Sequence, residues 1–429
     1  MARVVFYIPH FLIGFLLFSL PVSIAGMELF GWLLALGSLV RALWIRVQKR
    51  APLGLCVGPE YMLWGLWGVA ALGAAIQQSH GADLVYIIGN FRWVLLLYGY
   101  SLALRWEPEF RPKWLVGLVA PVLLIVSLYG LVQVFTGVDL VRPGREIHSL
   151  VLANVQIFRA AGFFNNPMTF AHLFALWFCL LLGVILVGGV GDRARLWLRC
   201  VALVVAMALV LSLIRGVWIS VTVASLVMLG LYNRRIFIRA SLGLGLVLAI
   251  LVVAVPPIRA RVVSIFATDN VYNRDRVTLW KANWEIFKDH PLVGIGYTEN
   301  ERRIGEYYQR MGIEKGFHGH AHNVYLQFLA GTGLLGLGCY LGFILYFLLL
   351  TYQLWRRIPP DEAWDRSLAL GALGAQISLH VGGMTQNNFS DGEVTHNFIF
   401  ILAIVVALSY KHLSRPLYWR ELFARKVGA

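Results

Sequence analysis

The chain has 429 residues, of which 59% are hydrophobic and only 14% are charged, and it carries a formal net charge of +15. Soluble globular proteins carry about 25% charged residues, so one water-soluble core cannot bury this much apolar surface. The apolar runs are continuous, whereas strands of a membrane barrel alternate in polarity over about ten positions. The composition therefore excludes a soluble domain and a barrel, and it indicates an all-α polytopic membrane protein.

Apolar runs long enough to cross a bilayer recur along the chain. The sequence predicts about 12 transmembrane helices, near residues 5–24, 27–45, 60–78, 84–104, 114–136, 168–190, 199–214, 217–232, 239–256, 323–352, 367–385 and 395–411. The first run is followed at once by the second, so it is interpreted as a span rather than a cleaved signal. The run at 323–352 is longer than a bilayer requires, and we expect it to start outside the membrane or to tilt.

Lysine and arginine mark every second connection between these spans. They occupy residues 46–50, 105–113, 192–199, 233–239, 355–366 and the tail from Lys411 to Lys426. The connections at 77–83 and 386–397 contain neither residue type. Because positive residues favour the cytoplasmic side, both termini are predicted to be cytoplasmic. This loop bias accounts for the net charge, and no nucleic-acid partner is expected.

The whole chain, 1–429, is interpreted as a single membrane domain with two longer outer connections. One is residues 137–167, and the other, residues 257–322, is the largest polar segment. No soluble domain is visible elsewhere, so the functional site is expected on this outer face. No predicted outer loop contains a cysteine, so no disulfide framework is expected for Cys56, Cys179, Cys200 and Cys339.

The large outer connection contains an amphipathic pattern at residues 273–296. One face at three- and four-residue spacing is formed by Val277, Trp280, Trp284 and Phe287. Proline and glycine at 291–296 then end the predicted helix. We expect this helix to lie at the membrane interface with its tryptophan face toward the lipid.

Ten arginines fall in the two outer connections: Arg142, Arg145, Arg159, Arg259, Arg261, Arg274, Arg276, Arg302, Arg303 and Arg310. The guanidinium group is planar, permanently charged and complementary to phosphate oxygens. Some of these side chains are expected to pair with nearby acids, but so large a set favours an anion-binding surface. Arg215 and Gly216 alone connect two apolar runs at the outer side. Arg215 either reaches to the interface or holds an anionic head group.

Three histidines, His318, His320 and His322, stand immediately before the span at 323. An extended segment would place them on one face, as in a metal site, but the chain lacks a zinc signature and a D-x-D pair. The alternatives are polar residues at the interface or a general base, for which His322 is the best candidate. An imidazole pKa of about 6.5 suits proton abstraction at neutral pH. No metal or cofactor is therefore expected, and no P-loop or dinucleotide motif is present.

The stretch "HNVYLQFLAGTGLLG" at 322–336 resembles a motif of the O-antigen ligase family. That motif is His, then Asn, Ser or Gln, nine residues, Gly, and a small residue three positions later; here it comprises His322, Asn323, Gly333 and Gly336. Residues 276–296 are similar to the family's large-loop pattern of Arg, Trp and a terminal hP-h-G-h-G (h, hydrophobic). Residues 159–172, "RAAGFFNNPMTFAH", look like its Arg-x-x-Gly and Asn-Pro signature. Arg215 matches the arginine expected between two spans.

This resemblance implies a superfamily of O-antigen ligases, O-antigen polymerases and protein O-oligosaccharyltransferases. Its fold is similar to metal-independent, lipid-dependent (GT-C-like) glycosyltransferases. The donor would be a glycan on undecaprenyl pyrophosphate, with its polyprenyl tail among the membrane helices. A ligase would transfer that glycan to the lipid A–core oligosaccharide at the periplasmic face of a Gram-negative inner membrane.

The chemistry of the residues and the resemblance together suggest expected roles for particular residues. His322 would be the general base, and Arg215 would stabilise the departing pyrophosphate. Binding of the pyrophosphate would also involve Arg159, Arg274, Arg276, Arg302, Arg303 and His320. His318 and His320 are not part of the family motif, so two alternatives stay open for them: they line the pocket, or they have no role.

Other functions remain open at the level of sequence. A polymerase keeps every residue role and changes only the acceptor. A protein-glycosylating transferase would carry a larger outer C-terminal region, whereas this chain is predicted to end in the cytoplasm. A transporter fits the span count but needs a pathway to both sides. Most spans lack a central ionisable residue; Arg92 is the exception, expected near a helix kink or in a pair across the bundle.

Overall fold

The computed structural model describes residues 2–49, 58–106, 112–152, 154–264, 271–314 and 316–423. Within these residues, nine helical segments are long and apolar enough to cross a membrane: Ile24–Gln48, Asp83–Arg105, Pro112–Thr136, Pro167–Val187, Asp192–Leu211, Arg215–Tyr232, Arg234–Ala254, Val324–Arg357 and Gly392–Leu413. The prediction of a helical, polytopic membrane protein is therefore confirmed. Cys56 lies outside the described residues.

The helices of the first half are α1 (Ala2–Ser19), α2 (Ile24–Lys49), α3 (Glu60–Ile76), α4 (Gly81–Asn90), α5 (Arg92–Trp106), α6 (Pro112–Trp114), the π-helix η1 (Leu115–Val119), α7 (Ala120–Thr136), α8 (Pro167–Val187) and α9 (Asp192–Leu211). Those of the second half are α10 (Arg215–Tyr232), α11 (Arg234–Ala254), α12 (Pro256–Val263), α13 (Val271–Asp289), α14 (Glu299–Arg310), α15 (Val324–Arg357), α16 (Ala363–Gly382), α17 (Gly392–Leu413) and α18 (Trp419–Leu422).

Three further predicted spans are helices in the structure, but they are shorter or less apolar than the nine segments above. They are α1, the 17-residue α3, and α16. Helix α16 packs along α8 and α10 in the interior, and it carries the buried polar side chains Gln376 and His380. Neighbouring helices shield these groups from lipid, which explains a central helix of lower hydropathy. The count of twelve and the cytoplasmic location of both termini stay predictions.

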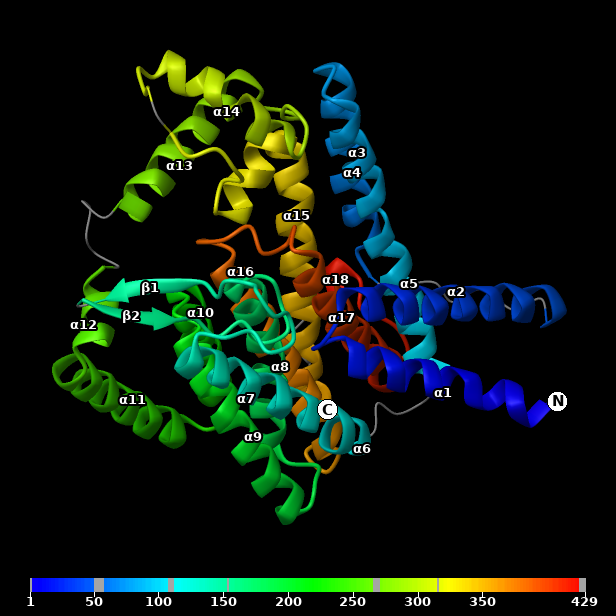
Figure 1. Ribbon diagram of the computed structural model, residues 1–429. Helices are drawn as coiled ribbons and strands as arrows, with labels where there is room; N and C mark the ends of the chain where they lie inside the picture. The colour runs from blue at the N-terminus through cyan, green and yellow to red at the C-terminus, as the bar shows by residue number, and fades with distance from the viewer. Residues whose placement is uncertain are drawn as a thin grey trace.

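The connection at 137–167 contains a small sheet, which the all-α prediction did not include. Strands β1 (Ser149–Leu152) and β2 (Val155–Phe158) form an antiparallel hairpin in which Ser149 pairs with Phe158. Asn154, at the turn, has a φ of 62°, a left-handed conformation that asparagine tolerates better than most residues. The hairpin lies against α12 (Figure 1), so it joins the two outer connections.

Helix α15 folds back on itself at Gly333, whose φ of 62° and ψ of −164° are not helical. The rings of Phe328 and Tyr340 lie 4.4 Å apart, whereas twelve residues of continuous helix extend about 18 Å. Residues 324–332 therefore form a short helix that turns back along the start of the long one. This reversal accounts for the unusual length of the apolar run; a start outside the membrane and a tilt stay predictions.

The segment at 291–296 holds this reversal in place. Leu334 N donates to Pro291 O at 2.9 Å, and Gly296 N donates to Gly331 O at 3.0 Å. A β-carbon at Gly333 would overlap the carbonyl group of Leu292, and one at Gly294 would overlap the backbone at Gly331. The two glycine-containing stretches thus cross at backbone contact, which larger residues would prevent.

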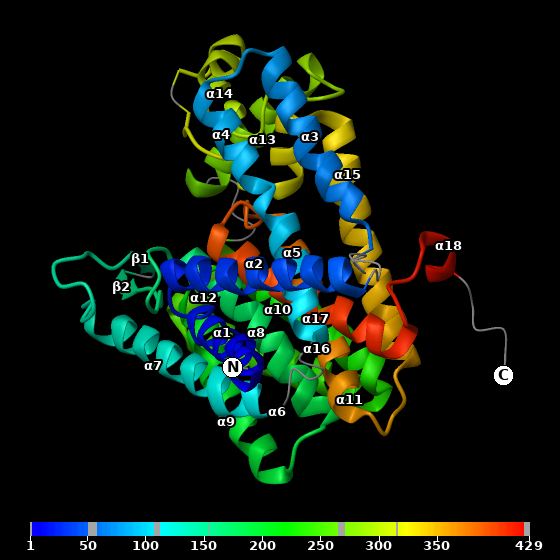
Figure 2. The same ribbon diagram turned by 90° about the vertical axis from the view of Figure 1, so that its right-hand side faces the viewer.

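The predicted amphipathic helix is confirmed as α13, but its expected apolar face is divided. Leu279, Ala282 and Ile286 form the buried face, which packs on α14. Val277 and Trp284 are 43% and 48% exposed. Trp280 Nε1 donates to Ala321 O at 2.9 Å, whereas the ring of Phe287 lies 5.1 Å from that of Trp284. The expected orientation of the tryptophan face toward the lipid stays a prediction. Figures 1 and 2 show α13 and α14 at the end of the molecule to which α3 and α4 also extend.

Arg92 lies at the break between α4 and α5, as the sequence suggested. Its Nη1 atom lies 3.1 Å from Glu28 Oε1 in α2, so the pairing across the bundle is confirmed. The pair accounts for this ionisable residue without a transport pathway.

Candidate functional site

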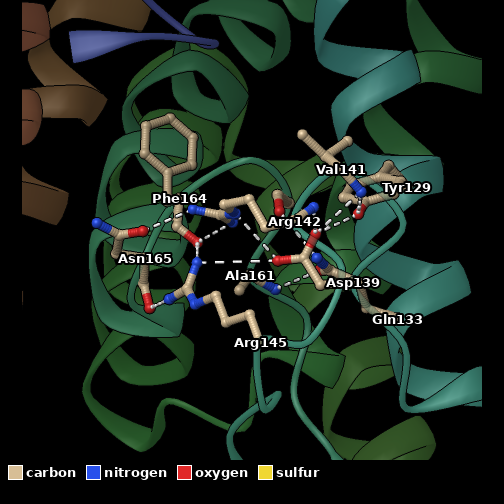
Figure 3. Close-up of polar contacts among 10 residues, drawn as sticks. Tyr129, Gln133, Asp139, Val141, Arg142, Arg145, Ala161, Phe164 and Asn165 are labelled. Carbon is tan, nitrogen blue, oxygen red and sulfur yellow. Dashed lines mark hydrogen bonds and ion pairs between the residues drawn. The ribbon is translucent and has the colours of Figure 1, made fainter.

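Two arginines of the first outer connection hold together the loop that precedes α8, through hydrogen bonds and ion pairs (Figure 3). Arg142 Nε lies 3.1 Å from Asp139 Oδ2, and its Nη2 donates to Phe164 O at 3.0 Å. Arg145 Nη1 lies 3.8 Å from the same Asp139 oxygen and 3.4 Å from Phe164 O. Tyr129 in α7 donates to Asp139 Oδ1 at 2.6 Å. These arginines therefore stabilise the loop rather than present free charge.

Helix α7 anchors the next part of the loop. Gln133 Nε2 donates to Gly162 O at 2.9 Å, and Ala161 N donates to Gln133 Oε1 at 3.2 Å. A single glutamine side chain thus satisfies one backbone carbonyl group and one backbone N–H group of the Arg-x-x-Gly stretch. This contact fixes the main chain from which Arg159 extends.

Arg159 reaches the C-terminal end of α9. Its backbone N donates to His148 O at 2.9 Å, and its Nε donates to Ser212 O at 2.9 Å. The last carbonyl groups of a helix lack helical partners and carry partial negative charge. A guanidinium group therefore satisfies them and is held in a defined orientation.

Arg261 in α12 contacts the same helix end. Its Nη2 and Nε donate to Leu213 O at 2.8 and 3.2 Å. Leu213 has a φ of 58°, a strained conformation for a residue of this type. The turn between α9 and α10 thus brings two guanidinium groups from distant segments together.

Arg215 is the first residue of α10, directly after that turn. Its Nη1 donates to the carbonyl and hydroxyl oxygens of Ser264, the latter at 3.1 Å. Its Nη2 donates to Asn273 Oδ1 at 2.8 Å. All three acceptors are neutral, so these contacts orient the guanidinium group without cancelling its charge.

His322 stands just before the short helix at 324–332, whose first N–H groups are capped by Asn323 Oδ1. Its Nδ1 lies 2.8 Å from Gln386 Oε1, and its backbone N donates to His320 Nδ1 at 3.1 Å. The His322 backbone has a φ of 48°. The rings of His320 and His322 lie 4.1 Å apart. Contacts on the backbone and the ring therefore fix this histidine.

These side chains border one cavity of about 350 Å³, within the ~300–1,000 Å³ range of ligand pockets. Its described lining comprises His148, Ser149, Leu150, Arg159, Met168, Ile214, Arg215, Gly216, Arg261, Asp275, Arg276, Leu279, Phe317, His322, Thr385 and Gln386. Four of these lining residues are arginines, and one, Asp275, carries a carboxylate. The cavity is therefore positively charged and suited to an anion.

Four of the predicted site residues meet in this cavity: Arg159, Arg215, Arg276 and His322. Arg274 does not line it, because residues two apart on a helix point about 200° away from each other. Arg302 and Arg303 extend from α14, and Arg303 Nε lies 3.5 Å from Glu306 Oε2.

His320 likewise does not line the cavity, although it supports His322 from behind. Burial, with the charges of His322 and Arg276, lowers the pKa of His320 to about 3. A neutral ring whose Nδ1 accepts a backbone hydrogen bond is a positioning group rather than a cation. His318 lies apart, with its ring 5.9 Å from that of Tyr308.

Burial sets the charge state of the reactive candidates. It lowers the pKa of His322; the hydrogen bond with Gln386 raises it in part, and Arg276 lowers it. Burial and then the charge of Arg215 lower the pKa of Arg276, yet a guanidinium group stays charged at neutral pH. The site thus combines an unprotonated imidazole with cationic groups, the arrangement that base-assisted chemistry on an anionic substrate requires.

Sequence reasoning did not single out His148, Asp275, Thr385 or Gln386 as site residues. Arg261 was only one of ten loop arginines. The polar run "TQNN" at 385–388, between two apolar helices, was an available signal. His148 offered none, since its place depends on the hairpin that follows it.

Metal-ligating side chains cluster elsewhere in the described part of the chain. Glu362, Asp365 and His412 have ligand atoms within 4.8 Å of one another, but Lys411 Nζ already lies 2.6 Å from Asp365 Oδ2. None of these residues lines the arginine-rich cavity. The cavity offers guanidinium groups where a metal site would need carboxylates or several histidines.

Residues 200–341 match the family model described as O-antigen ligase. The chain carries an O-antigen ligase family segment. The resemblance is thereby confirmed over a stretch that includes Arg215, Arg276, His322 and Gly333, while Arg159 lies before it. The match supports an enzyme of the O-antigen ligase or polymerase type that acts on lipid-linked polysaccharide. No curated protein matches the chain.

Proposed function

We propose that the protein transfers O-antigen polysaccharide from undecaprenyl pyrophosphate to a terminal sugar of the lipid A–core. The reaction would take place on the periplasmic face of a Gram-negative inner membrane and would complete lipopolysaccharide. The observation that carries the proposal is that Arg159, Arg215, Arg276 and His322 share one cavity, although they come from four separate segments.

In the proposed reaction, His322 Nε2 takes the proton from an acceptor hydroxyl group. The acceptor oxygen then attacks the anomeric carbon on the face opposite the pyrophosphate. A new glycosidic C–O bond forms as the C–O bond to phosphate breaks, so the anomeric configuration inverts. The electron pair leaves with undecaprenyl pyrophosphate, and the proton remains on the imidazole until solvent removes it.

Arg159, Arg215 and Arg276 stabilise the charge that develops on the departing pyrophosphate. Preorganised cations directed at developing charge are often the largest contribution to catalysis. The partners of Arg215 support this role, because Ser264 and Asn273 fix its guanidinium group through neutral oxygens and do not neutralise it. Leu150, Met168, Ile214 and Leu279 add an apolar lining, which suits the start of a polyprenyl chain.

The chemistry of the cavity requires no metal ion, since guanidinium groups supply the positive charge. This part of the proposal has its own test. Loss of transfer in EDTA, followed by recovery with zinc or magnesium, would contradict it.

The test of function is deletion of the gene in its host, followed by two gels. One displays lipopolysaccharide, and the other displays glycan released from the polyprenyl carrier. Complementing plasmids carry the wild type, His322→Ala or Arg215→Ala. A ligase predicts loss of the whole lipopolysaccharide ladder with long carrier-linked chains, restored by the wild type alone. A core that still carries one repeat, without long chains, would instead identify a polymerase. Two unchanged gels would reject both reactions.

A further inference from the structure

Gln386 contacts the candidate base from a part of the chain outside the family match. Its Oε1 atom lies 2.8 Å from His322 Nδ1, and Gln386 itself lines the cavity. It belongs to the connection between α16 and α17, whereas the family match ends at residue 341. The family segment therefore does not contain everything that touches its own histidine.

The connection that carries Gln386 is held firmly at both sides. Thr385 N donates to Gly382 O at 3.1 Å, and Asn388 Nδ2 donates to Leu379 O at 2.8 Å. Asn388 is 2% exposed. A β-carbon at Gly216 would overlap Thr385 Oγ1, so this connection also packs directly beside Arg215. Gln386 is thus a fixed partner of His322 rather than a mobile surface side chain.

The chemistry of the contact determines which ring nitrogen carries the proton. An amide oxygen only accepts hydrogen bonds, so the neutral imidazole must donate from Nδ1. Its lone pair then resides on Nε2, the nitrogen free to accept a proton from substrate. The backbone contact from His322 N to His320 Nδ1 prevents the residue from turning away. Orientation of a catalytic histidine through its other nitrogen is a general device of enzymes.

We propose that Gln386 is a positioning residue that holds His322 in the Nδ1–H tautomer and directs Nε2 at the acceptor hydroxyl group. This inference rests on the proposed function, in which His322 is the base. Gln386 touches neither the donor nor the acceptor in this role. It acts only through the imidazole.

The test compares Gln386→Glu and Gln386→Leu in the full-length protein, reconstituted in nanodiscs. The titration of His322 is followed by NMR with isotope-labelled histidine, and His322→Ala identifies its signal. A carboxylate at 386 raises the pKa of His322 by about one pH unit or more, and leucine lowers it because a stabilising hydrogen bond is lost. A titration that stays at its wild-type position in both variants would overturn the inference.

Transfer from a purified undecaprenyl-pyrophosphate glycan to lipid A–core supplies the second readout. Gln386→Leu should lower kcat by roughly 10- to 100-fold with little change in KM, as loss of an orienting partner does elsewhere. Gln386→Glu should retain the tautomer, recover most of that loss, and shift the acid limb of the rate to higher pH. Gln309→Glu, which adds the same charge at an exposed position of α14, is the matched control and should leave both readouts unchanged.

The two readouts separate the possible failures. If the wild type transfers no glycan, the proposed function fails. If the titration moves while the acid limb of the rate does not, His322 is not the base, although its pairing with Gln386 holds. If Gln386→Leu is as active as the wild type, Gln386 does not position the base, whatever the titration shows.

Discussion

Arg215 Nη2 lies 2.8 Å from Asn273 Oδ1, and this hydrogen bond joins the start of α10 to the start of α13. Asn273 is followed within one helical turn by Arg276, which lines the same cavity. The contact therefore places a guanidinium group from a membrane helix beside one from the outer connection. It links the lipid-embedded part of the protein to its largest polar loop.

Replacement of Arg215 by lysine should abolish most transfer although the charge is kept. A single ammonium group cannot contact Ser264 and Asn273 together and still face a pyrophosphate. We expect kcat to fall by about 10²- to 10³-fold, the usual effect of removing one transition-state donor. The assay is single-turnover transfer in nanodiscs. Arg235→Lys, at an exposed position of α11, is the control, and equal rates for the two variants would contradict the role of Arg215.

The pH dependence of transfer should follow the lowered pKa of His322. Burial lowers the pKa of this imidazole, so the base is already unprotonated at neutral pH. The rate should be flat around pH 7 and should fall only as the pH drops through a value below about 6.5. His322→Ala should lower the rate by about 10²- to 10⁴-fold and remove this acid limb. An acid limb above the ordinary histidine value would oppose the assignment.

Gly333→Ala should destabilise the protein, because the reversal of α15 needs a left-handed residue with no β-carbon. The substitution adds backbone strain and an overlap with Leu292. We expect a loss of more than about 1 kcal/mol in the free energy of unfolding, visible as a lower Tm in detergent. Gly338→Ala is the matched control, since nothing lies within 4 Å of a β-carbon there. Equal Tm values for both variants would mean that the chain does not reverse at Gly333.

Asp139→Asn should loosen the loop before α8. The carboxylate is 3% exposed and receives contacts from Tyr129, Arg142 and Arg145, so we expect a loss of about 1–3 kcal/mol. Glu306→Gln, which breaks the exposed pair with Arg303, should cost at most about 1 kcal/mol. Thermal unfolding of both variants measures the difference.

The lowered pKa of Asp139 predicts that the stability of the protein decreases as its carboxylate is protonated at low pH. Burial alone would raise the pKa of Asp139, but the hydrogen bond from Tyr129 and the hydrogen bonds and charge of Arg142 outweigh it, and the pKa is lowered. Its stabilising contribution is therefore present above the ordinary aspartate value of about 3.9 and is lost as the pH falls through the lower folded value. The difference in Tm between the wild type and Asp139→Asn should shrink over that range. A difference that grew on acidification would refute the ion pair.

Local pattern in the sequence was sufficient for the membrane class, most of the spans and the helix α13. Apolar runs of membrane-spanning length alternate with charged connections along the chain. Both features depend on neighbouring residues only, so they are visible in the sequence without knowledge of distant contacts. His322, Arg215 and Arg276 could be selected in the same way, because each stands in a short motif. The reversal at Gly333 was hidden, since an apolar run on both sides of a glycine also describes one straight helix.

Only the tertiary structure decided which of the loop arginines share a cavity. Arg142 and Arg159 are alike in sequence terms, yet Asp139 binds the first and the end of α9 orients the second. Arg274 and Arg276 differ only by the rotation of one helix. Gln386 lies more than 60 residues from His322 along the chain. It belongs to the site because the α16–α17 connection packs against Arg215 and His322. The sequence by itself determined the helices and the chemical groups, because these depend on neighbours along the chain; the choice of partners depends on packing between segments that are distant in sequence.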